Sequence, residues 1–89
     1  MKVNENVIHR NVAGEDMLVP VGEAAGEMNG LYVLTPTGGE IWDMLADGKT
    51  VDEIVSILSE DYGEDPVMIR EDVLGVIEKL KAYHLVTED

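Results

Sequence analysis

One segment joins a predicted strand directly to a predicted helix: LYVLTPTGGEIWDML, from Leu31 to Leu45. The first four residues are β-formers or large apolar residues, and the turn pair Asn29-Gly30 precedes them. A short strand that runs into a helix without a linker holds both in a fixed relative orientation. We therefore take the free edge of this strand as the candidate working surface.

The helix has a clear start. Thr35 is a good N-cap, and Pro36 falls at the first helical position, where its missing N–H is not needed. Ile41 and Leu45 recur at helical spacing beside Trp42, the only tryptophan in the chain. This pattern predicts a helix that buries Trp42 in the core.

Two β-rich runs come before this segment. The runs from Val7 to Ala13 and from Met17 to Val21 flank Gly14-Glu15-Asp16, which predicts a hairpin with a three-residue loop. Pro20 cannot donate to a ladder, so the second strand should be irregular or exposed there. Residues 22–30 are predicted to form a loop that leads into the third strand.

Two more helices are predicted downstream. Thr50-Val-Asp-Glu53 fits a capping box, and Gly63 marks the end of that helix. Asp65-Pro66 repeats the N-cap and first-turn pattern for a helix reaching about Tyr83. The short tail Leu85-Val86 is expected to return as an edge strand. Three antiparallel strands followed by three helices make an α+β domain.

The last helix carries more apolar surface than one face needs. Its core stripe consists of Ile69, Val73, Val76, Ile77 and Leu80. Val67 and Leu74 lie on a flank with Arg70, Glu78 and Lys81. This flank is either the helix side of a groove, or a surface in which the apolar residues complete the packing against the sheet and the cations pair with local acids.

Composition limits the class of protein. Eighty-nine residues are enough for one domain, spanning 1–89, and no internal repeat is visible. A net charge of −13 argues against nucleic acid and against anionic membrane surfaces. It favours solubility or a basic partner, such as a basic leader peptide or docking face. Without a signal peptide, an apolar span or cysteine, the expected location is the cytoplasm.

Catalytic and metal-binding motifs are not recognisable. His9 and His84 have no companions at ligand spacing, and Gly38-Gly39 lacks the Lys-Ser/Thr of a phosphate loop. Neither serine, Ser56 or Ser59, has an activating histidine nearby in the sequence. The expectation is a protein that is not an enzyme and needs no cofactor or metal.

The order of segments resembles the PqqD family over essentially the whole chain. The most specific parts are the strand-to-Ile41-Trp42 segment and the helix entry Asp47-Gly-x-Thr-x-x-Glu-Ile54. The resemblance implies a winged helix-turn-helix-like domain that binds peptide rather than DNA. It also implies a role as an adaptor that holds the leader of a ribosomally made precursor peptide and presents it to a maturation enzyme, commonly a radical SAM enzyme.

The resemblance places the leader as an added strand in a cleft between the third strand and the third helix. On this sequence the peptide-binding residues are then Leu31, Tyr32, Val33, Leu34 and Thr35, opposite Val67, Arg70, Leu74 and Lys81. The physical basis is β-augmentation, in which backbone hydrogen bonds give affinity and side-chain pockets give selectivity.

Two other functions compete with the adaptor. A DNA-binding winged helix would read DNA with the third helix, but that helix mixes Glu71, Asp72 and Glu78 with its cations. A structural module would pair the third-strand edge with its own copy in a homodimer. The sequence does not separate that use of the edge from peptide binding, and it does not name the precursor.

Overall fold

The computed structural model describes residues 1–22 and 32–88. In this part of the chain, β2 (Val7–Val12), β3 (Glu15–Pro20) and β4 (Tyr32–Leu34) form an antiparallel sheet in that order. The helices are α2 (Pro36–Ala46), α3 (Val51–Tyr62) and α4 (Pro66–Ala82). The α+β arrangement of three strands followed by three helices is confirmed. Leu31 and the predicted loop from residue 23 onward lie outside the described residues.

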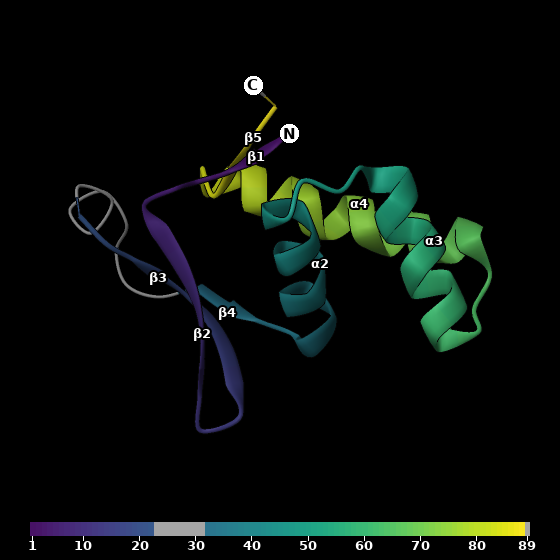
Figure 1. Cartoon of the computed structure of the whole chain (residues 1–89), viewed down its shortest axis with the longest axis horizontal. Coiled ribbons are helices and arrows are strands. Elements are labelled where there is room, and N and C mark those ends of the chain that lie inside the picture. The colour runs from purple at the N-terminus through teal and green to yellow at the C-terminus, as the bar shows by residue number, and fades with distance from the viewer. Residues whose placement is uncertain (23–31, 89) are drawn as a thin grey trace.

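A second, two-stranded sheet joins the two ends of the chain. Strand β1 (Lys2–Val3) pairs with β5 (Val86–Thr87), so the predicted return of the C-terminal tail is confirmed, while β1 was not predicted. Asn4 adds to this contact, because its backbone N–H donates to the carbonyl of Leu85 at 2.8 Å. Figure 1 shows both termini beside this strand pair, away from the larger sheet.

The hairpin turn is tighter than predicted. It uses two residues, Ala13 and Gly14, with φ angles of 53° and 87°, where the sequence pattern predicted Gly14-Glu15-Asp16. Positive φ at both central residues is the signature of a type I′ turn, whose twist matches that of the strands. The prediction was wrong because alanine rarely adopts a left-handed conformation. Pro20 sits at the end of β3, opposite Val7.

The predicted helix caps are confirmed. Thr35 accepts a hydrogen bond from the Gly38 backbone N–H at 3.0 Å, and Pro36 begins α2. Thr50 and Glu53 form the reciprocal capping box at 3.2 and 3.0 Å. These local interactions satisfy N–H groups that the first turn of a helix leaves unpaired.

One core lies between the larger sheet and the helices. Figure 1 shows α2 between this sheet and α3. Helix α4 packs against α3 and also contacts α2. Trp42 is buried with 3% of its surface exposed, as predicted. The other buried apolar residues are Val7, Leu18, Leu34, Ile41, Leu45, Ile54, Val55, Leu58, Ile69, Val73, Ile77, Leu80, Leu85 and Val86.

Candidate functional site

Strand β4 is the edge of the larger sheet. Its three residues pair with β3, with Leu18 opposite Tyr32, Met17 opposite Val33 and Asp16 opposite Leu34. No strand within residues 1–22 and 32–88 pairs with the other edge of β4. An unpaired edge presents backbone donors and acceptors to any extended chain that lies alongside it.

The helix that follows fixes the position of this edge. Leu34 is buried in the core, and the next residue, Thr35, caps α2. Gly38 lies in the first turn, where an added Cβ would come within 3.1 Å of Thr35 Oγ1 and 3.5 Å of Leu34 Cδ2. Gly38 therefore lets the first turn of α2 pack closely against the end of β4.

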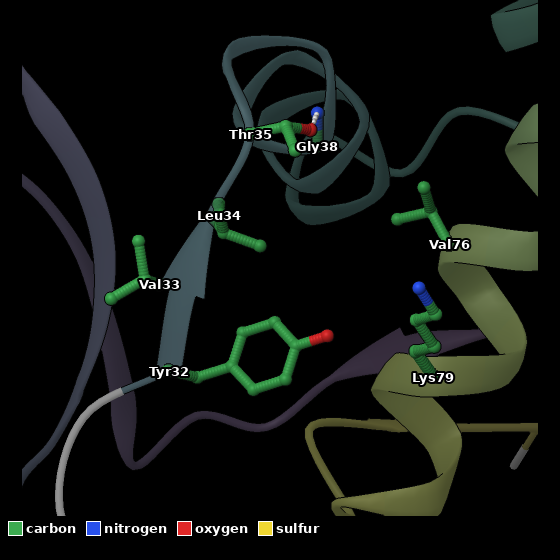
Figure 2. Close-up of a pocket in the computed structure, with 7 residues that line it drawn as sticks. All are labelled: Tyr32, Val33, Leu34, Thr35, Gly38, Val76 and Lys79. Atoms are coloured by element: carbon green, nitrogen blue, oxygen red, sulfur yellow. Dashed lines mark hydrogen bonds between the residues drawn. The ribbon is translucent and has the colours of Figure 1, made fainter.

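A pocket of about 150 Å³ lies between β4 and α4. A cavity of similar volume in another protein holds a benzene ring, so this pocket has room for one large apolar side chain. The residues that line it are Tyr32, Val33, Leu34, Thr35, Gly38, Val76 and Lys79 (Figure 2). The free strand edge and a side-chain pocket are therefore adjacent.

Alternate residues of β4 point to opposite sides. Figure 2 shows the side chains of Tyr32 and Leu34 directed toward α4, whereas Val33 points away. The Tyr32 ring packs edge-on against Tyr83, with 5.2 Å between ring centroids. Burial raises the pKa of the Tyr32 phenol, so the ring stays neutral. A peptide strand added to β4 would face this apolar wall with every second side chain.

The wall contributed by α4 differs from the one expected. It consists of Val76 and Lys79, whereas the sequence analysis proposed Val67, Arg70, Leu74 and Lys81. At 100° per residue those four positions lie on the opposite flank of α4 from Lys79. The structure therefore brings Tyr32, Val33, Leu34 and Thr35 together at the groove, without the four predicted helix residues.

That opposite flank faces α3 and the C-terminal tail. The Arg70 guanidinium binds the Asp52 carboxylate of α3 at 2.6 Å, and the Lys81 ammonium binds Glu88 at 2.5 Å. Val67 and Leu74 expose 67% and 43% of their surface. The interpretation that these two residues complete the packing against the sheet is therefore wrong. Peptide contact at this flank remains a prediction.

Three residues that line the groove, Gly38, Val76 and Lys79, were not predicted as site residues from the sequence, and Lys79 is the charged one. A signal was present, since helical spacing places Lys79 on the same flank as Val76 and Tyr83. Val76 had been assigned wholly to the core stripe. It is in fact partly buried, so that it both packs on the core and lines the pocket.

A polar cluster outside the groove connects the sheet to α2. His9 of β2 lies between two carboxylates, with Nε2 2.9 Å from Asp16 Oδ1 and Nδ1 2.7 Å from Asp43 Oδ1. Burial lowers the pKa of His9, but the hydrogen bonds to Asp43 and Asp16 outweigh burial and raise the pKa overall. The bond from His9 in turn lowers the pKa of Asp16. This bridge holds the hairpin against the helix that begins beside the groove.

The described residues contain neither a metal-binding cluster nor a helix that could span a membrane. No group of three or more His, Cys, Asp or Glu side chains in them is arranged to hold a metal ion. None of their helices combines the length and hydropathy needed to cross a membrane.

Solved structures share this fold. The chain is similar to TbiB1, solved in complex with the TbiA(beta) leader peptide, with a TM-score of 0.82 and 22% identity over 100% of this chain and 98% of that chain. It is also similar to lasso peptide synthetase B1, solved in complex with its leader peptide, with a TM-score of 0.75 and 16% identity over 91% and 89% of the two chains. The fold is α+β and winged-helix-like.

The family comparison agrees with the resemblance in segment order. No curated protein matches the sequence. The model of the family described as coenzyme PQQ synthesis protein D (PqqD) matches residues 17–86, which include β4, most of β3 and all of α2, α3 and α4. The chain therefore belongs to the PqqD family.

Proposed function

We propose that this domain is a non-catalytic recognition element for the leader segment of a ribosomally synthesised precursor peptide. The leader adds as a strand to the free edge of β4 and places alternate side chains in the groove against α4. The observation that carries this proposal is the edge of β4, which no strand within residues 1–22 and 32–88 pairs with, beside a pocket that α4 completes. The leader peptides in the complexes of the two similar structures support it.

Strand addition suits a protein that must hold a variable peptide. Backbone hydrogen bonds to β4 give affinity that depends little on sequence, and the pocket between Leu34 and Val76 gives selectivity. Strand β4 is already held by β3 and by the cap of α2. The conformational entropy lost on binding is therefore mainly that of the peptide. A short leader segment then binds with moderate affinity and can be released after modification.

The domain is expected to serve a separate maturation enzyme, and a radical SAM enzyme is our proposal for it. The leader stays on β4 while the enzyme modifies the remainder of the precursor. The competing DNA-binding function is less well supported, because α4 would be the reading helix and its Glu71, Asp72 and Glu78 are all exposed. Exposed carboxylates on a reading helix repel the phosphate backbone.

The test is an NMR titration of the isotopically labelled domain with the leader peptide of the precursor encoded beside its gene. We expect the largest amide shifts at Tyr32–Thr35 and Val76–Lys79. A scrambled peptide of the same composition serves as the control. Shifts confined to Val67–Leu74 would move the site to the opposite flank of α4, and a concentration-dependent dimer through β4 without peptide binding would favour the structural module.

A matched pair of variants separates the two flanks of α4. Val76→Ser changes the groove, and Leu74→Ser changes an exposed leucine on the opposite flank of the same helix. We expect Val76→Ser to weaken leader binding and Leu74→Ser to leave it unchanged. The reverse result would contradict the proposed site.

A further inference from the structure

Lys79 is a cation of the groove that no side chain in the described part of the domain neutralises. The chain has six Lys and Arg residues, and Lys49, Arg70 and Lys81 form ion pairs with Asp47, Asp52 and Glu88. Within residues 1–22 and 32–88, Lys79 forms no ion pair and no side-chain hydrogen bond. Lys2 and Arg10 are also unpaired there, but they lie on β1 and β2 and do not line the pocket.

The sequence of α4 explains why Lys79 is unpaired. On a helix surface a side chain meets those three and four residues away. For Lys79 these neighbours are Gly75, Val76, Ala82 and Tyr83, and none is a carboxylate. Of the nineteen Asp and Glu residues in the chain, none therefore lies three or four residues from Lys79.

The surroundings of Lys79 strengthen any ion pair made there. Val76 and Tyr32 line the same pocket and exclude part of the solvent around it. A charge pair beside apolar surface is screened less than one in open water. Figure 2 shows Lys79 near the Tyr32 end of β4 and Val76 nearer the Leu34 end.

We infer that the groove selects an extended peptide with an acidic side chain against Lys79 and a large apolar side chain in the pocket beside Val76. This inference rests on the proposed function and names the class of peptide that it takes. Both side chains must project from the same face of the added strand, so they are two residues apart in the peptide. The acidic contact assigned to Arg70 and Lys81 from the sequence thus moves to Lys79.

The charge of the whole domain makes this contact selective. A net charge of −13 repels an acidic peptide at a distance, but at physiological salt that repulsion is screened beyond about 8 Å. At contact the nearest charge dominates, and within the pocket that charge is Lys79. An acidic residue at another position of the peptide does not meet a cation of the pocket, so Lys79 fixes the register of the bound strand.

The experiment uses short synthetic peptides of alternating Thr and Ser with one central Leu. A Glu, Gln or Lys is placed two residues before or after the Leu, and binding is followed by amide shifts of the labelled full chain. We expect one of the two Glu peptides to bind about threefold to fivefold more tightly than its Gln counterpart, and the Lys peptide to bind more weakly. This preference should disappear in Lys79→Met and reverse in Lys79→Glu.

Two variants serve as controls. Lys49→Met removes the same charge at a residue that does not line the groove, and it should keep the preference for Glu. Lys81→Met removes the cation on the opposite flank of α4 and should also keep it. Because Lys79 is exposed and unpaired in the described part of the chain, Lys79→Met should still fold, with a melting temperature lowered only slightly by the added net negative charge.

The outcomes separate this inference from the proposed function. Peptide-induced shifts at Tyr32–Thr35 without a preference for Glu, or with a preference that survives Lys79→Met, overturn the inference and leave strand addition intact. If neither these peptides nor the neighbouring leader shifts β4, both are overturned. A Glu preference lost in Lys81→Met but kept in Lys79→Met returns the acidic contact to the opposite flank.

Discussion

His9 is the residue that couples the sheet to the first helix. It comes from β2, yet its two ring nitrogens lie against Asp16 of β3 and Asp43 of α2. In the sequence, His9 has no companion at metal-ligand spacing, and no local pattern indicates this role. The role that the structure gives it is to bridge elements that are 34 residues apart in the chain.

The bridge should make stability depend on pH. Despite the lowering effect of burial, the hydrogen bonds to Asp43 and Asp16 raise the pKa of His9 in the folded state. Its contribution is therefore complete below the unfolded pKa of about 6.5 and is lost as the pH rises through the folded pKa. We expect the melting temperature of the wild type to fall between about pH 6 and pH 8, measured by circular dichroism.

The control is His9→Gln, which does not titrate in this range. Its melting temperature should change less over the same interval. The hydrogen bond from His9 lowers the pKa of Asp16 in the folded state. The stability that the ionised Asp16 contributes is therefore lost in acid, as the pH falls below the unfolded pKa of about 4 and through the lower folded pKa. Identical profiles for wild type and variant between about pH 6 and pH 8 would mean that the bridge does not stabilise the fold.

At the level of elements, the fit between the hairpin and α2 depends on Gly39. A Cβ at this position would lie 3.2 Å from Asp16 Cγ and 3.3 Å from His9 Cε1. Those two side chains are hydrogen-bonded to each other, and His9 also to Asp43, so they have little freedom to move aside. The glycine therefore permits the close approach that makes the bridge.

Gly39→Ala should destabilise the domain. Crowding in a packed site costs about 1–3 kcal/mol, which exceeds the gain of about 0.5–1 kcal/mol from alanine in a helix. Gly75→Ala is the matched control, because it is also helical and its Cβ would meet nothing within 4 Å. It should stabilise the domain in urea unfolding. If both variants were stabilised to the same extent, His9 and Asp16 would have to move aside to make room for the added methyl group, and the close fit at Gly39 would be contradicted.

At the scale of the whole molecule, the dominant feature is its negative charge. With a net charge of −13, the folded state holds like charges closer together than the unfolded chain does, and this self-repulsion opposes folding. Salt shortens the Debye length from about 10 Å at 0.1 M to about 3 Å at 1 M. We expect the melting temperature to rise with added NaCl.

A variant with fewer acids provides the control for this salt effect. Neutralising the exposed Glu71, Asp72 and Glu78 of α4 to Gln, Asn and Gln leaves the core unchanged. Its melting temperature should rise less with NaCl than that of the wild type. A fall in the wild-type melting temperature with salt would mean that attractive pairs such as Arg70–Asp52 outweigh the repulsion.

Local chemistry allowed much of the fold to be predicted. The Thr35 cap, the Thr50–Glu53 capping box and the end of α3 at Gly63 depend on neighbours within a few residues, so the sequence pattern is sufficient. The hairpin was predicted but its turn was not, because Ala13 adopts a left-handed conformation that the flanking strands impose. Strand β1 was missed because two residues carry no periodic signal.

The candidate site was predictable on one side only. The strand side was predictable because a run of β-forming residues directly precedes a helix cap. As predicted from the sequence, Tyr32, Val33, Leu34 and Thr35 lie at the groove. On the helix side, the sequence predicted the flank of Val67, Arg70, Leu74 and Lys81, whereas Val76 and Lys79 line the pocket. Periodicity identifies the apolar stripe of α4 but not which side of it faces β4. Val76 shows the difficulty, because a residue at the edge of the stripe both packs on the core and lines the pocket.

The sequence by itself determined the order of the elements, their caps, the burial of Trp42 and the acidic surface, because these depend on local propensity and composition. Only the tertiary structure decided which flank of α4 meets the sheet edge, which cation lines the pocket and what His9 bridges. Those outcomes depend on the rotation of packed helices and on contacts between residues far apart in the chain. A helical repeat specifies which residues share a face, and packing against the other elements specifies where that face points.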